Sequence, residues 1–149
     1  MRSNILLLLL ALLSSYLSSA QIGEVVTGRK GTLIGTGNGK IDGLPELRLY
    51  KINGEDYYVI TYRNSEYNTF IDLQSFGFYA TPQELEFLYN FIRDGLKSEE
   101  RRTLKVGEST LMTNRFLSRQ VAVHVFQVGK PDTYFLLNQN WLDRLFGKK

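Results

Sequence analysis

The chain has 149 residues, no cysteine, one histidine and one tryptophan, and it carries 18 basic against 15 acidic side chains. This length accommodates one domain with a sizeable core. The basic residues are scattered and the charge is nearly balanced, which makes nucleic acid an unlikely partner, and the lack of cysteine excludes a disulfide-stapled fold.

Residues 1–20 have the three-part pattern of a secretory signal peptide. Arg2 precedes an apolar run over 5–13, and a Ser/Ala-rich stretch ends in Ser18 and Ala20. A membrane-spanning helix needs about 20 apolar residues, so this run is too short to be one. We expect cleavage after Ala20, a mature chain without a transmembrane segment, and a periplasmic or extracellular location.

Residues 21–44 contain seven of the thirteen glycines and read as an N-terminal arm or a glycine-rich hairpin. The stretch GTLIGTGNGKI resembles a phosphate-binding loop, but Ile34 stands where that motif requires glycine, and Ile41 stands where it requires serine or threonine. The sequence therefore favours a chain reversal at Asn38-Gly39 and predicts no nucleotide cofactor.

Residues 45–149 read as a single α+β domain that begins with strands. The pair Asn53-Gly54 separates two strand-like runs and predicts a type I′ hairpin. A third strand is expected within 68–79, where aromatic and β-branched residues are frequent.

The main helix is expected at about 82–97. Thr81 is suited to the N-cap, Pro82 to the first helical position, and Glu84 completes a capping box. Leucine and isoleucine then recur at helical spacing along one stripe.

The second half of the chain repeats this order of elements. Strands are expected on both sides of Gly107-Glu108, in RQVAVHVFQV and in TYFLL, followed by a short helix at about 140–146 that Asn138 or Asn140 caps. The helix entries FYATPQELEFL and FLLNQNWLDRL also match at several positions. We therefore predict one or more antiparallel sheets with a main helix and a short C-terminal helix. The matching entries indicate a duplicated strands-then-helix unit, with a chance match of common strand, cap and helix patterns as the alternative.

Catalytic and metal-binding patterns are weak. His124 stands alone, without the positioned nucleophile that covalent catalysis requires, and we interpret it as a sheet residue on the less buried face. Asp72 is the one acid in an apolar context, and a single acid is insufficient for glycosidase chemistry. We expect no catalytic residue, no cofactor and no metal site.

Tyrosines are concentrated in the first half of the chain. On YYVITY, Tyr58 and Tyr62 share one face of the expected strand, while Tyr50 belongs to the strand before it. Such a row could stack sugar rings or dock a protein, and we name these three tyrosines as candidate ligand-binding residues. The alternative is that they form cross-strand pairs packed under a helix.

The signal peptide, the segment YRNSEYNTFIDLQSFGF and the closing WLDRLFGK resemble small secreted α+β proteins of Bacteroidota-type bacteria. The resemblance implies export and no particular activity. Our first hypothesis is an exported, non-catalytic binding module of the cell envelope or extracellular space, with a protein or glycan partner. The alternatives are a small hydrolase of envelope polymers and a structural or assembly subunit.

Overall fold

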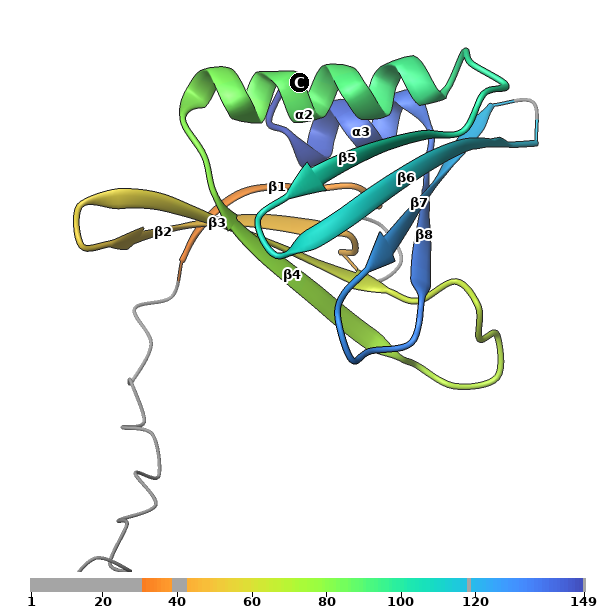
Figure 1. Ribbon diagram of the computed structural model, residues 1–149, viewed down its shortest axis with the longest axis horizontal. Helices are drawn as coiled ribbons and strands as arrows, with labels where there is room; N and C mark the ends of the chain where they lie inside the picture. The colour runs from red at the N-terminus through yellow and green to blue at the C-terminus, as the bar shows by residue number, and fades with distance from the viewer. Residues whose placement is uncertain (1–30, 39–42, 118, 149) are drawn as a thin grey trace, which may run out of the picture.

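A computed structural model of the protein describes residues 31–38, 43–117 and 119–148 (Figure 1). It contains two four-stranded antiparallel sheets and two helices, which confirms the predicted α+β class. The predicted signal peptide, residues 21–30 of the expected arm and the Asn38-Gly39 reversal beyond Asn38 lie outside the described residues.

Sheet A is formed by the first half of the chain, with its strands side by side in chain order. They are β1 (Thr32–Thr36), β2 (Glu46–Ile52), β3 (Glu55–Arg63) and β4 (Leu73–Tyr79). Asn53 and Gly54 both have positive φ, 51° and 84°, as a type I′ turn between β2 and β3 requires. Residues 32–36, which the sequence placed in a glycine-rich arm or hairpin, form the edge strand β1.

The third predicted strand is shorter than expected, because residues 64–72 form a loop before β4 begins. The Asn64 backbone N–H donates to the carbonyl oxygen of Asp72 at 2.8 Å and closes this loop. The Asp72 carboxylate accepts hydrogen bonds from the side-chain amides of Asn64 and Gln74, at 2.9 and 2.7 Å. Asp72 therefore holds the loop in shape.

Helix α2 (Pro82–Gly95) has the predicted capping box, with Thr81 and Glu84 exchanging both hydrogen bonds. Sheet B follows, again in chain order, and helix α3 (Gln139–Leu145) begins at Asn138, whose side chain accepts from the Trp141 N–H. The strands of sheet B are β5 (Arg102–Val106), β6 (Ser109–Phe116), β7 (Gln120–Phe126) and β8 (Thr133–Leu137). The chain thus contains the order of four strands and a helix twice, whereas the sequence predicted three strands before the first helix and four before the second.

Each helix packs against the sheet of the other half. Helix α2 lies against β6 and β7, α3 lies against β1, and the two helices are neighbours (Figure 1). A methyl group on Gly95 of α2 would be 2.9 Å from Cβ of Thr113, and one on Gly35 of β1 would overlap the backbone oxygen of Arg144. These glycines permit the close approach of helix and sheet.

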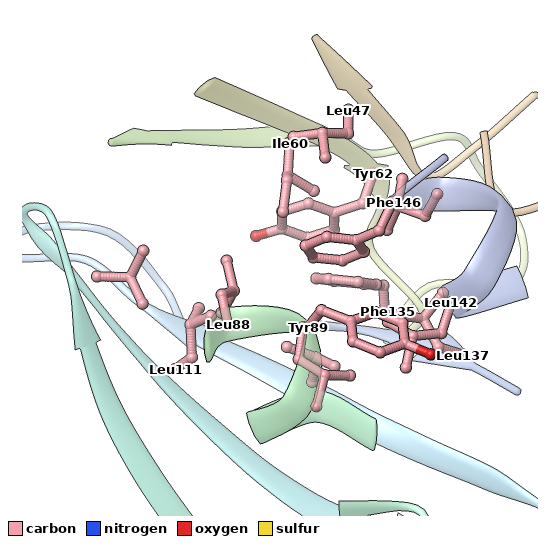
Figure 2. Packing of buried hydrophobic residues seen from close by; sticks show 14 of the residues in the cluster. Leu47, Ile60, Tyr62, Leu88, Tyr89, Leu111, Phe135, Leu137, Leu142 and Phe146 are labelled. Carbon is pink, nitrogen blue, oxygen red and sulfur yellow. The ribbon is translucent and has the colours of Figure 1, made fainter. Parts of the chain in front are cut away.

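One hydrophobic core joins the two halves (Figure 2). Tyr62 from sheet A and Phe135 from sheet B have ring centroids 4.6 Å apart. The Tyr89 hydroxyl of α2 donates to the Asp143 carboxylate of α3 at 2.7 Å. This core occupies the inner faces of both sheets and one side of each helix. A ligand site is therefore expected on the outer faces of the sheets or at the surface where the two halves of the chain meet.

Candidate functional site

Two of the three tyrosines that the sequence singled out belong to the core. Tyr58 is 4 % exposed and Tyr62 is fully buried. The Tyr62 hydroxyl lies 2.5 Å from Oγ1 of Thr133, and burial raises the pKa of both phenols. This corrects the expectation of a ligand-binding face, because neither ring is available to a ligand on the surface. The cross-strand packing that the sequence left as the alternative describes both residues.

The third candidate, Tyr50, lies on the opposite, outer face of sheet A. It pairs across the sheet with Tyr57 of β3, which in turn pairs with Tyr79 of β4. Tyr50 and Tyr57 are half-buried and Tyr79 is 54 % exposed. Since neighbouring strands are about 4.8 Å apart, this tyrosine row (Tyr50, Tyr57 and Tyr79) spans about 10 Å across three strands.

Two side chains of the tyrosine row pack closely on glycine, Tyr50 with its ring and Tyr57 with its hydroxyl end. A Cβ atom on Gly31 would be 2.5 Å from Cζ of Tyr50 and 2.7 Å from both of its Cε atoms, so it would stand above the ring plane. A Cβ on Gly77 would be 2.2 Å from the hydroxyl oxygen and 2.5 Å from Cζ of Tyr57, so it would stand over the hydroxyl end of that side chain. Glycine at these two positions therefore leaves room for both side chains to lie close to the sheet.

Tyr79 bounds the tyrosine row on the side of β4. Its ring centroid is 4.8 Å from that of Tyr57, and the two planes are inclined by 59°. Figure 1 shows the β2–β3 hairpin, which carries Tyr50 and Tyr57, projecting beyond the rest of the molecule. The row thus consists of two tyrosines on the projecting hairpin and an inclined third ring on the neighbouring strand β4.

Polar groups lie beside the row. In β2, the Arg48 guanidinium forms an ion pair with Glu46 at 2.9 Å and donates a hydrogen bond to the Gly31 carbonyl at 3.0 Å. The Lys51–Asp56 ion pair follows Tyr50 and Tyr57 by one step of the strand register and therefore points to the opposite face of the hairpin. Aromatic faces flanked by paired charges can combine ring stacking with hydrogen bonds to hydroxyl groups.

Tyr57 and Tyr79 are not among the candidates that the sequence identified. The signal that identifies them is Gly77, an isolated glycine within the aromatic stretch SFGFY. A glycine inside a strand often marks the close approach of another group to the backbone. Here the approaching group is the Tyr57 ring.

Three acids gather near the β2–β3 hairpin, where a hydrolase would need a pair of free carboxylates. A hollow of about 470 Å³ beside the hairpin contains Glu55, Asp56 and Glu84. Asp56 is paired with Lys51, while the Glu84 carboxylate accepts from the Thr81 N–H at 2.7 Å. Two of the three acids near this hollow are therefore already bound to partners.

His124 lies on the outer face of sheet B, as the sequence predicted. Its ring stacks on Tyr134 and Phe126, with centroids 5.2 and 6.4 Å away. Burial, helped by the charge of Arg101, lowers the pKa of His124 below its ordinary value. These contacts are those of a packed sheet residue.

Among the described residues, no three His, Asp or Glu side chains gather closely enough to hold a metal ion. Within the same ranges, neither helix has the length and hydrophobicity needed to cross a bilayer. Comparison of the chain with protein-family models, with curated proteins and with solved structures finds no match.

Proposed function

We propose that the protein is an exported, non-catalytic binding module that binds a glycan chain through the tyrosine row on the outer face of sheet A. The observation that carries this proposal is the packing of the Tyr50 and Tyr57 rings on Gly31 and Gly77. A tyrosine ring that packs on the backbone with one side leaves its other side for a ligand, and the C–H groups of a pyranose can stack on an aromatic face.

The extent of the row favours a chain over a single sugar. Three tyrosines in register across three strands offer successive contacts over about 10 Å. The Arg48–Glu46 pair, on the same face of β2 as Tyr50, supplies donors and acceptors beside the row for sugar hydroxyls. Export, which the sequence predicts from residues 1–20, would bring the module to envelope or extracellular glycans.

The test is a glycan array probed with residues 21–149, followed by isothermal titration with the oligosaccharide that binds best. Tyr57→Ala should weaken binding about tenfold, since stacking on an aromatic ring contributes about 1 kcal/mol or slightly more. Gly77→Ala keeps all three tyrosines but pushes the Tyr57 ring off the backbone, and it should weaken binding to a similar extent. Phe70→Ala, which removes a 53 % exposed ring from the β3–β4 loop, is the matched control and should bind normally.

Thermal melts of each variant separate lost binding from lost folding. Glycan binding that survives both Tyr57→Ala and Gly77→Ala would refute the proposal. Shortening of the oligosaccharide during the titration would favour the hydrolase alternative. A molecular mass that grows with concentration, without glycan binding, would favour the assembly alternative.

A further inference from the structure

A second hollow lies where the two halves of the chain meet, away from the tyrosine row. We name it the seam hollow and define it by six of its lining side chains. They are Arg63, Tyr67, Asn68, Phe116, Gln120 and Trp141. Its volume of about 390 Å³ falls within the range of small-molecule sites. Arg63 is six residues along β3 from Tyr57, so about 20 Å separates the hollow from the row.

The polar groups around the seam hollow are unused by the fold. Within the described ranges, the guanidinium of Arg63, the amides of Asn68 and Gln120, and the indole N–H of Trp141 have no hydrogen-bond partner. On the neighbouring strand, by contrast, Arg48 is paired with Glu46. Arg63, Gln120 and Trp141 are half-buried and Asn68 is exposed, so all four line the hollow with donors that a polar ligand can use.

The floor of the hollow is rigid. Asn64 is 2 % exposed, and its side-chain oxygen accepts from the backbone N–H groups of Glu66 and Tyr134, at 3.2 and 3.3 Å. The Ser65 N–H donates to the Tyr134 carbonyl at 2.8 Å, and the Tyr134 hydroxyl donates back to the Ser65 carbonyl at 3.2 Å. The loop of sheet A is thus fastened to the edge strand β8 of sheet B. A floor that is already held by these hydrogen bonds loses little conformational entropy when a ligand binds.

The chemistry of the unused groups selects a class of ligand. A guanidinium without a partner matches a carboxylate, which it can bind through two parallel hydrogen bonds. The amides of Asn68 and Gln120 can donate to and accept from hydroxyl groups. Tyr67, held by stacking on Phe70 at 4.6 Å, offers an aromatic wall together with Phe116 and Trp141. We propose that the seam hollow is a second binding site, for a small carboxylate-bearing sugar of the uronic acid type.

The chain contains its own reporter for this site, because Trp141 is its only tryptophan. Its fluorescence and its single indole N–H resonance both report on the hollow in residues 21–149. The probes are D-glucuronate, the neutral D-glucose that lacks the carboxylate, and acetate, which lacks the ring. Glucuronate should shift the indole resonance saturably and bind at least tenfold more tightly than the other two.

The variants test the roles of charge and geometry. Arg63→Gln should abolish the preference for glucuronate, and Arg63→Lys, which keeps the charge but not the planar fork, should retain part of it. Arg115→Gln is the matched control, since Arg115 is paired with Glu99 elsewhere on the surface. If Arg63→Gln fails to fold, the Arg63→Lys result decides.

Several results would overturn the inference. They are an indole resonance that glucuronate does not move, equal affinity for glucuronate and glucose, an affinity for acetate that equals that for glucuronate, or full binding by the Arg63 variants. This site does not rest on the proposed function of the tyrosine row. Tyr57→Ala should leave glucuronate binding intact and Arg63→Gln should leave the binding of neutral glycans intact, so the two proposals can fail separately.

Discussion

The hydrogen bond between Tyr62 and Thr133 joins sheet A to sheet B and can be measured by a double-mutant cycle. Its oxygens are 2.5 Å apart, Tyr62 is fully buried and Thr133 is 7 % exposed. Thr133→Val leaves the phenol hydroxyl without a partner in the core, and an unpaired buried group costs about 1–3 kcal/mol. Tyr62→Phe leaves the threonine hydroxyl unpaired and should lower the free energy of unfolding by about 1–2 kcal/mol.

The double variant is the informative one. With both hydroxyls removed, the two apolar groups fill the same space and nothing buried is left unpaired, so the combined loss should be about 1 kcal/mol or less. Urea unfolding of residues 21–149, followed by circular dichroism, gives all four free energies. Tyr79→Phe, which removes an exposed hydroxyl, should change stability by less than about 0.5 kcal/mol. Losses that add within about 0.3 kcal/mol would refute the coupling of the two sheets through this pair.

Three further predictions concern the packing of helices on sheets and the response to pH, each measured by the same urea unfolding. Gly35→Ala should lower the free energy of unfolding by about 2–3 kcal/mol, because its methyl group would collide with the backbone of Arg144. Gly95→Ala should lower it less, because its methyl group meets only side chains and alanine favours the helix. A larger loss at Gly95 than at Gly35 would contradict this packing. Thr113→Val should raise the free energy of unfolding by about 1 kcal/mol, because the threonine hydroxyl is buried without a partner among the described residues, and a loss would indicate that the hydroxyl is bonded after all. Burial lowers the pKa of His124 in the folded state, so below pH 6.5 the unfolded state takes up the proton more readily. The free energy of unfolding should therefore fall as the pH is lowered below 6.5, and it should fall less in His124→Gln. The same dependence on pH in the two proteins would contradict this.

The elements that sequence reasoning identified well are those with local signals. The capping box of Thr81 and Glu84 and the turn at Asn53-Gly54 each depend on residues within four positions of one another, and both occur as predicted. Strand β1 carries no such signal, because its glycines read as a loop until pairing with β2 and contact with α3 are known. The start of β4 has no local sequence signal either, because it depends on the hydrogen bond between Asn64 and Asp72 that closes the loop.

The choice of face on β3 could not be made from the sequence. YYVITY carries aromatic or branched residues on both faces, so alternation does not say which face is buried. What decides is the partner of Tyr62, a threonine 71 residues further along the chain. The seam hollow could not be predicted from the sequence either, because its lining comes from both halves of the chain and no short motif indicates that they meet.

The duplicated order of elements bears on which of these features serve the fold. Both helices pack on the inner faces of the sheets. The outer faces of sheet A and sheet B therefore share one structural requirement, which is to pack their aromatic side chains without a helix over them. Sheet B meets it by stacking His124 between Phe126 and Tyr134, ring on ring. Sheet A instead places two tyrosine rings on glycine, at Gly31 and Gly77, and gives up a side chain at each position. Since the second unit folds without that arrangement, the architecture does not demand it, and binding at the exposed ring faces is the reason we propose for its presence.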